Sequence, residues 1–283
     1  MTSINTIGVV GAGQMGAGIA QVFATAGYKV IMQDIKQEFV DKGSATIKGS
    51  LAKFLEKQKI TKEQHDVAIA NLKTTLDIKD LAGCDIVIEA APENIVLKTE
   101  IFKSLDQITK KDAILATNTS SISIEKIGNV TKRGDKIIGM HFMNPVPIMQ
   151  CVEIIRSQKT SDATCAVVTE LVKKLGKIAV TSKDSPGFIM NRILMPMINE
   201  AISALHEGVA TPEDIDTGCK LSFNWPMGPL TLADLIGLDT VLAIVNVLYK
   251  EFKNEKYKPC PLLEEYVKKG WLGRKTKRGF YAY

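Results

Sequence analysis

Residues 7–16, Ile7-Gly-Val-Val-Gly-Ala-Gly-Gln-Met-Gly16, decide the fold of the first half of this chain. A short apolar run, typical of a buried strand, leads into a G-x-G-x-x-G turn and then into an alanine-rich segment with helical spacing. Residues 28–34 form a second apolar run, which ends in Asp34. In this strand–turn–helix–strand order, glycines let the backbone approach a pyrophosphate at the start of the helix. The sequence therefore predicts a dinucleotide site, for which the glycines alone would be a weak signal.

The acid at the end of the second run indicates which dinucleotide binds. Asp34 follows Gly16 by 18 residues, the place where a carboxylate hydrogen-bonds the adenosine ribose hydroxyls. The same negative charge repels a 2′-phosphate, so NAD is favoured and NADP is disfavoured. Gln33 and Lys36 flank this acid closely and could soften the preference.

The alternation of strands and helices continues to about residue 182. Strand-like apolar runs cover residues 85–89, 113–117, 136–141 and 177–182. This order predicts a Rossmann-type, doubly wound α/β sheet, in which ligands lie beyond the carboxyl ends of the strands. Glu93, Asn118 and Ser120 follow such ends, so we expect all three to line the cofactor crevice. The alternative for Ser120 is a helix N-cap, a role that Ser121 or Ser123 could equally fill.

An insertion of residues 36–71 separates the second and third strands and reads as a helical pair. Residues 36–62 contain seven lysines against three acids. Ser50, Lys53 and Lys57 can share one helix face, because residues three and four apart are neighbours. The ordinary interpretation of such lysines is a solvated helix face. The functional interpretation is that they attract a polyphosphate ligand.

The stretch of residues 139–154 contains a candidate proton-transfer pair. His141 ends one apolar run, a Pro145-Val-Pro147 corner follows, and Glu153 lies in the next apolar run. A strand, a corner and a returning strand would bring the two side chains together. A carboxylate that orients a histidine makes a general acid–base catalyst near neutral pH.

We predict two domains: residues 1–184 form the nucleotide-binding domain, and residues 185–283 form an all-helical domain. The helical patterns of the second domain begin near Ser185, a candidate N-cap, and continue through a long run interrupted by Pro196. The apolar helices exceed what one small domain can bury, so we expect this domain to make a subunit interface. Asn191 could cap a helix, face solvent or point toward the cleft. Lys275 lies in a glycine-bounded basic loop that is either a solvated tail or a phosphate contact.

Composition excludes several classes of protein. Of 283 residues, 45% are hydrophobic and 24% are charged, which is ordinary for a globular protein. No apolar run reaches the ~18–20 residues of a membrane span, and because the first strand begins by Ile7 we expect no signal or transit peptide. Five scattered cysteines lack metal-ligand spacing, so we expect reduced thiols, a cytoplasmic location and no metal. Aromatic residues do not interleave with the lysines, which argues against nucleic-acid binding.

Several motifs, in order along the chain, resemble one family. They are residues 11–16, 91–93, 117–121, 141–145, 153, 186–191 and 279–281. Together they are similar to the short-chain (S)-3-hydroxyacyl-CoA dehydrogenases, and most similar to the clostridial 3-hydroxybutyryl-CoA members. The resemblance spans essentially the whole chain.

The resemblance implies reversible hydride transfer between NAD and the 3-position of an acyl-CoA. The reaction would interconvert acetoacetyl-CoA and (S)-3-hydroxybutyryl-CoA in butyrate or fatty-acid metabolism. His141 would be the general acid/base and Glu153 would hold its imidazole, while Ser120 and Asn191 would bind the reacting oxygen. Ser50 and Lys57 match coenzyme A contacts, with Lys53 between them. The expected cofactor-binding residues are Gly11, Gly13, Gln14, Met15, Gly16, Asp34, Ala91, Glu93, Lys98, Asn118, Ser120, Asn144 and Lys275. A homodimer or higher homo-oligomer is expected.

Two other interpretations remain open. A related hydroxyacid dehydrogenase that acts on a free acid needs the same cofactor platform and base but no grip on coenzyme A. A dinucleotide-binding protein without catalysis needs neither His141 nor Glu153.

Overall fold

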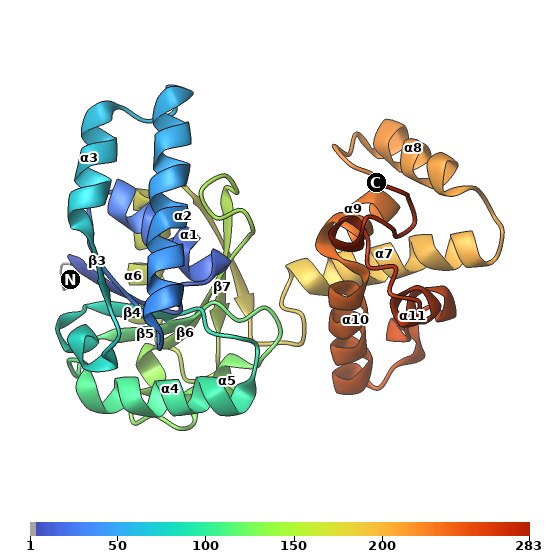
Figure 1. Ribbon diagram of the computed structural model, residues 1–283. Coiled ribbons are helices and arrows are strands. Elements are labelled where there is room, and N and C mark those ends of the chain that lie inside the picture. The colour runs from blue at the N-terminus through green and yellow to red at the C-terminus, as the bar shows by residue number, and fades with distance from the viewer. Residues whose placement is uncertain (1–3) are drawn as a thin grey trace. The chain divides into compact units, whose positions relative to one another are not determined.

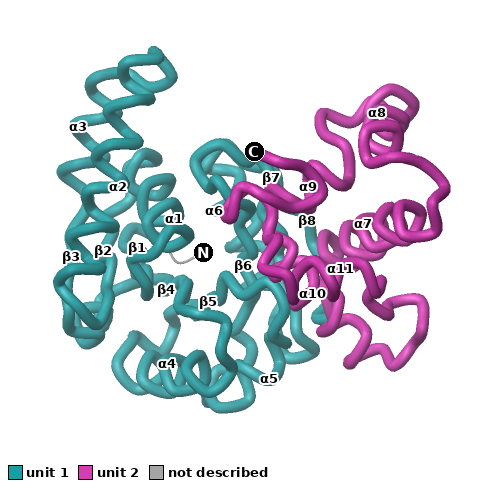
Figure 2. Tube along the Cα trace, turned by 45° about the vertical axis from the view of Figure 1, so that its right-hand side comes forward, with its two compact units in different colours: residues 1–185 teal, residues 186–283 magenta. Residues whose placement is uncertain are grey.

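The computed structural model describes residues 4–283, and the chain forms two compact units (Figure 2). One unit ends at Ser185 and the other begins at Pro186. The boundary predicted from the sequence, between residues 184 and 185, lies one residue earlier.

The first unit is built on one eight-stranded sheet with the strand order β3-β2-β1-β4-β5-β6-β7-β8. The strands are β1 (Thr6–Val10), β2 (Lys29–Gln33), β3 (Leu72–Thr75), β4 (Ile86–Glu89), β5 (Ile114–Thr117), β6 (Ile137–Phe142), β7 (Cys151–Arg156) and β8 (Ile178–Lys183). All neighbouring strands are parallel except β6 and β7, which are antiparallel. The order reverses between β1 and β4, which is the switch point where doubly wound sheets bind their ligands.

Helices flank this sheet (Figure 1). They are α1 (Gln14–Thr25), α2 (Gln37–Glu56), α3 (Lys62–Asn71), α4 (Ile95–Ile108), α5 (Ile124–Gly128) and α6 (Asp162–Lys174). In Figure 1, α1, α2 and α3 lie above the sheet, and α4 and α5 lie below it. Strands β4 and β5 are buried throughout, which explains their continuous apolar sequences. The doubly wound sheet predicted from the sequence is confirmed.

The helical pair predicted within residues 36–71 is confirmed as α2 and α3. A capping box between Thr61 and Gln64 starts α3, because each side chain accepts a bond from the other residue's backbone N–H. The edge strand β3 follows α3 directly and is absent from the sequence prediction. Its four residues, Leu-Lys-Thr-Thr, are too few to show an alternating pattern.

The second unit is helical, as predicted. Its helices are α7 (Met190–His206), α8 (Pro212–Phe223), α9 (Pro229–Ile236), α10 (Leu238–Phe252) and α11 (Pro261–Lys268). A core that includes Met195, Ile198, Leu230 and Val241 joins α7, α9 and α10. Pro196 lies inside the continuous helix α7 and does not end it.

The predicted N-cap at Ser185 is wrong. Helix α7 begins at Met190, and Ile189 is its N-cap. Gly187 and Phe188 have φ angles of +74° and +50°, so the chain is in left-handed conformation just where the helix was expected to start. Right-handed helix cannot include these residues.

Residues 279–283 are tied to the rest of the second unit by hydrogen bonds, so they are not a solvated tail. The buried carboxylate of Asp234 accepts hydrogen bonds from the backbone of Phe280 and Tyr281 and from the hydroxyl of Tyr283. Burial raises the pKa of Asp234 despite these bonds. The Tyr281 hydroxyl donates to a second buried carboxylate, Asp216, at 2.9 Å. This docking holds the neighbouring loop that carries Lys275.

Candidate active site

The glycine-rich loop between β1 and α1 borders a cleft of about 1160 Å³. A Cβ atom on Gly16 would lie 1.8 Å from the carbonyl oxygen of Gly11, so packing of the loop on α1 requires this glycine. A Cβ on Gly13, the N-cap residue of α1, would meet no atom within 4 Å. Gly13 therefore faces open space at a helix N-terminus, where a pyrophosphate can approach the backbone closely. The loop fits a dinucleotide.

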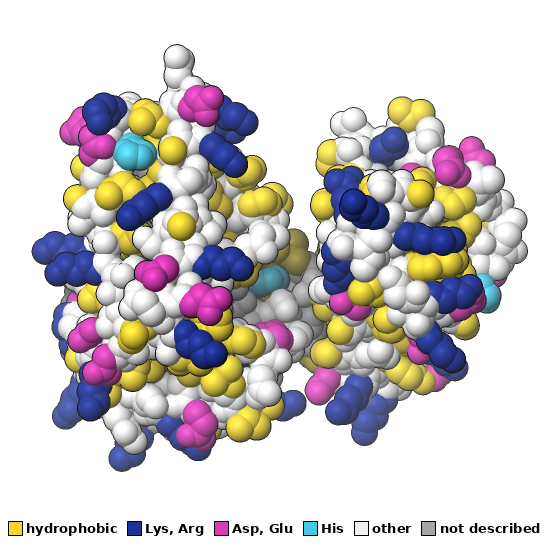
Figure 3. All heavy atoms as spheres, viewed as in Figure 1, with side chains coloured by type: hydrophobic (Ala, Val, Ile, Leu, Met, Phe, Trp, Pro, Cys, Tyr) yellow, Lys and Arg dark blue, Asp and Glu magenta, His cyan; other side chains and the backbone are white. Residues whose placement is uncertain are grey.

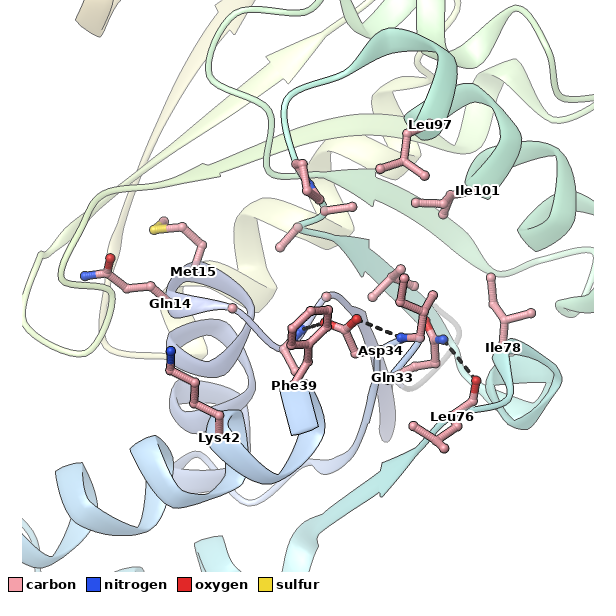
Figure 4. Close-up of a pocket in the computed structure, with 18 of the residues that line it drawn as sticks. Gln14, Met15, Gln33, Asp34, Phe39, Lys42, Leu76, Ile78, Leu97 and Ile101 are labelled. Atoms are coloured by element: carbon pink, nitrogen blue, oxygen red, sulfur yellow. Dashed lines mark hydrogen bonds between the residues drawn. The ribbon is translucent and has the colours of Figure 1, made fainter. Parts of the chain in front are cut away.

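Asp34 lies on the same cleft, just beyond β2 (Figure 4). Its carboxylate accepts hydrogen bonds from the backbone N–H groups of Ala12 and Ile35, each at 2.7 Å. The side chain is thus held in place beside the loop, and a carboxylate has further acceptor sites for ribose hydroxyls. The predicted cofactor residues that line the cleft are Gly11, Gly13, Gln14, Met15, Asp34 and Ala91.

Glu93 organises the loop that follows β5. Its Oε1 atom accepts hydrogen bonds from the Thr119 hydroxyl at 2.5 Å and from the backbone N–H groups of Ser120 and Ser121 at 2.9 and 3.0 Å. Although burial opposes it, the hydrogen bond from Thr119 and the charge of Lys98 lower the pKa of Glu93. Helix α5 is capped by Ser123 and not by Ser120, so the capping alternative for Ser120 is wrong.

The other predicted residue at this edge, Asn118, joins two strand ends. Its Oδ1 atom accepts a hydrogen bond from the backbone N–H of Phe142 at 2.9 Å. The end of β5 is thereby tied to the end of β6, next to His141.

Lys98 is only 1% exposed, which the sequence prediction of a cofactor contact did not anticipate. Its ammonium group donates to the Oε1 atom of Glu89 at 2.7 Å and to the carbonyl of Ala91 at 3.1 Å. Glu89 is 0% exposed and was missed by sequence reasoning, because it ends a strand that is otherwise apolar. Direct contact of Lys98 with a ligand would require this network to open.

The structure brings His141 and Glu153 together. They are directly opposite in the antiparallel register of β6 and β7, and His141 Nδ1 lies 3.1 Å from Glu153 Oε2. The side chains are 10% and 0% exposed, respectively. An ionised carboxylate only accepts hydrogen bonds, so in this geometry Nδ1 carries the proton that faces Glu153. Proton exchange with a ligand would then use the other ring nitrogen, Nε2.

The corner between β6 and β7 is anchored from two sides. The Asn144 Oδ1 atom accepts a hydrogen bond at 3.0 Å from Gln14 Nε2, in the first turn of α1. On the other side of the corner, Lys177, directly before β8, donates to the carbonyls of Val146 and Met149, each at 2.7 Å. Burial lowers the pKa of Lys177 because it disfavours the charged form. Sequence reasoning did not single out Lys177.

One face of α2 runs from the cleft toward the far end of the helix. Lys42 and Thr46 line the cleft, and Ser50, Lys53 and Lys57 continue the same face at spacings of four, three and four residues. Lys53 and Lys57 are exposed, and Ser50 is half-buried. The predicted coenzyme A residues therefore lie on a surface continuous with the cleft.

Two predicted site residues belong to the second unit. Asn191 lies in the first turn of α7 and is 8% exposed. Lys275 lies in a short 3₁₀ turn of residues 274–276, where its ammonium forms an ion pair with Asp239. This pair lowers the pKa of Asp239, although burial opposes the shift.

Residues 4–283 contain no cluster of three or more His, Cys, Asp or Glu side chains that could hold a metal. Within the same residues, no single helix is long and apolar enough to cross a membrane, although α9 and α10 together, bent by 99°, pass on length and composition. Figure 3 shows basic side chains interspersed with acidic and apolar ones on the visible face of each unit.

A glycine-rich loop at the switch point of a doubly wound sheet, with an acid at the end of the second strand, defines a dinucleotide-binding protein. The chain belongs to the 3-hydroxyacyl-CoA dehydrogenase family. Residues 6–185 match the model of that family's NAD-binding domain, and residues 187–283 match the model of its C-terminal domain. The cofactor of this fold is therefore NAD.

Similar proteins cover nearly the whole chain. A probable 3-hydroxybutyryl-CoA dehydrogenase of Deinococcus radiodurans is 53% identical over 98% of this chain and 99% of its own length. The 3-hydroxybutyryl-CoA dehydrogenase of Clostridioides difficile is 49% identical over 98% and 99% of the two chains. The crystal structure of (S)-3-hydroxybutyryl-CoA dehydrogenase from Ralstonia eutropha superposes with a TM-score of 0.97, at 54% identity and 99% coverage of both chains.

Proposed function

We propose that this protein is an NAD-dependent 3-hydroxybutyryl-CoA dehydrogenase, which interconverts acetoacetyl-CoA and (S)-3-hydroxybutyryl-CoA. The observation that carries the proposal is the buried His141–Glu153 pair, placed at the carboxyl end of β6 in a sheet of the NAD-binding family. Names of relatives at 49–53% identity support the same substrate.

The proposed roles follow from the chemistry of a ketone reduction. Bound NADH supplies the hydride, and the oxygen at the 3-position must then gain a proton. His141 gives this proton from Nε2 and takes it back in the reverse direction. Glu153 keeps Nδ1 protonated and stabilises the charged imidazole. Ser120 and Asn191 bind the reacting oxygen.

The remaining site residues bind and orient the two ligands. The glycine-rich loop, Asp34 and Ala91 hold the dinucleotide, with Glu93, Lys98, Asn118 and Asn144 toward its nicotinamide half. Lys275 supplies a further cofactor contact. Asp34 favours NAD over NADP through repulsion of a 2′-phosphate. Ser50, Lys53 and Lys57 hold the phosphates of coenzyme A, because the face of α2 that they form continues from the cleft.

We further propose that the second unit makes a homodimer. Large apolar side chains of α7 and α8 are exposed in the single chain: Ile193 is 65%, Leu221 is 80% and Phe223 is 61% exposed. The surface of a partner subunit would remove such side chains from water. Sedimentation of a monomer at micromolar concentration would contradict this part of the proposal. The unpaired cysteines fit a reducing, cytoplasmic setting, where we place the enzyme in butyrate or fatty-acid metabolism.

One spectrophotometric experiment separates the proposal from its rivals. NADH absorbance should fall when acetoacetyl-CoA is added and should stay constant with free acetoacetate. Consumption of NADH with the free acid alone would favour a hydroxyacid dehydrogenase. NADH binding without consumption of either substrate would favour a non-catalytic dinucleotide-binding protein.

Replacing Lys57 by alanine should raise the KM for acetoacetyl-CoA by up to about fivefold and spare kcat. An exposed ion pair contributes roughly 0.2–1 kcal/mol, and 1 kcal/mol corresponds to about fivefold in affinity. Lys48 is a matched control, because it is an exposed lysine nine residues earlier, on the opposite side of α2. Equal effects of Lys57→Ala and Lys48→Ala on KM would show that only overall charge matters.

A further inference from the structure

A group of three charged side chains, two of them buried, lies at the carboxyl end of β4. Lys98 contacts two carboxylates, Glu89 at 2.7 Å and Glu93 at 3.4 Å. Glu89 and Lys98 are 0% and 1% exposed, and the Glu93 side chain is 37% exposed. Two carboxylates and one ammonium give this triad a net charge of −1 when all three are ionised.

The triad is rigidly built into the strand ends. The Oε2 atom of Glu89 accepts from the Thr117 hydroxyl at 2.7 Å, and its Oε1 atom also accepts from the backbone N–H of Ala91 at 2.6 Å. Ala91 in turn lines the cleft. Buried ion pairs add little net stability, because the cost of desolvation offsets the attraction. A pair that is completely buried at a ligand site therefore calls for another explanation.

The position of the triad relates it to one half of the cofactor. Asp34, at the end of β2, lies on one side of the switch point, and the triad lies on the other side, at the ends of β4 and β5. A dinucleotide lies across this point, with its adenosine half by the acid that follows the second strand. The half nearest the triad is then the nicotinamide, whose ring is cationic in NAD⁺ and neutral in NADH.

We propose that the Glu89–Lys98–Glu93 triad sets the relative affinity of the protein for NAD⁺ and NADH through its net negative charge. The inference rests on the proposed NAD binding. A negative potential stabilises the cationic ring, and charges removed from water are screened less than exposed ones. Charge near the reactive ring is one of the means by which proteins tune a bound cofactor. Glu89, which is 0% exposed, acts in this way without contacting the ligand.

The test is the ratio of the dissociation constants, Kd(NAD⁺)/Kd(NADH), measured by calorimetry and NADH fluorescence without substrate. Glu89→Gln removes one negative charge, so the ratio should rise about threefold to tenfold. Lys98→Gln removes the positive charge, so the ratio should fall by a similar factor. The double variant keeps only the charge of Glu93, and its ratio should return to within about twofold of the original.

Opposite shifts of Kd(NAD⁺)/Kd(NADH) in the two single variants distinguish an electrostatic effect from loosened packing. Loosened packing would weaken the binding of both NAD⁺ and NADH in each variant. Lys98→Gln leaves Glu89 buried without its cation and is the variant most prone to unfold. If Lys98→Gln does not fold, the other two variants test the proposal: Kd(NAD⁺)/Kd(NADH) should rise in Glu89→Gln and should return to near the original value in the double variant. Lys110→Gln is the control, since Lys110 pairs with Asp85 before the opposite end of β4, and it should leave the ratio unchanged.

Two results would overturn the inference: an unchanged ratio in Glu89→Gln, or a double variant whose ratio stays raised. Failure of the unmodified protein to bind either form of NAD would instead overturn the proposed function. The two failures are therefore distinguishable.

Discussion

Replacing His141 by glutamine is expected to lower kcat for acetoacetyl-CoA reduction by about 10²–10⁴, the usual contribution of a positioned general acid. Glutamine keeps a hydrogen-bonding side chain of similar length opposite Glu153, but it cannot deliver a proton at neutral pH. The affinity for NADH should stay within about twofold, because the loss falls on proton transfer and not on binding. Steady-state kinetics and NADH fluorescence titration give both quantities.

The same substitution at His65 provides the control. His65 lies in α3, where its Nδ1 is 2.9 Å from Asp66, and it has no part in the proposed site. His65→Gln should leave kcat unchanged. Equal turnover of the unmodified protein and His141→Gln would exclude His141 as the acid.

Two glycines of the same loop should respond in opposite ways to alanine. Gly16→Ala places a methyl group 1.8 Å from a backbone oxygen, so the loop or α1 must shift. We expect a loss of about 3 kcal/mol in the free energy of unfolding, near the upper end for an overpacked interior. Gly13→Ala meets no protein atom within 4 Å and should change stability by less than about 1 kcal/mol.

Gly13→Ala should impair the binding of NADH although it spares stability. The methyl group of Gly13→Ala would occupy space at the N-terminus of α1 that the pyrophosphate needs, so affinity should fall by about tenfold or more. Thermal unfolding and fluorescence titration of both variants provide the comparison. A Gly13→Ala protein that is stable and binds NADH normally would show that the ligand does not approach the loop there.

Much of the fold could be predicted because its signals are local. The G-x-G-x-x-G turn, the apolar runs and each helix of the pair in residues 36–71 can be recognised from a stretch of about twenty residues or fewer. The pairing of His141 with Glu153 was predictable as well, since one corner separates the two strands that carry them. Asp34 directly follows β2, close to the predicted strand end.

The features that escaped prediction depend on contacts distant in sequence. Glu89 and Lys177 are single charged residues at the edges of apolar segments, and their partners come from other elements. Ser185 has good capping chemistry, yet the left-handed backbone at Gly187 and Phe188 delays the helix. No pattern around Lys98 indicates that its ammonium is buried against Glu89.

His141 and Glu153 lie directly opposite each other on β6 and β7, and this determines which segments can be altered without separating them. Register along β6 and β7 sets their separation, because each residue of one strand faces a fixed residue of the other. Strand pairing, and not the corner of residues 143–150, therefore holds His141 opposite Glu153. Substitutions within that corner should change its contacts with α1 and with Lys177 while the separation of His141 and Glu153 stays the same.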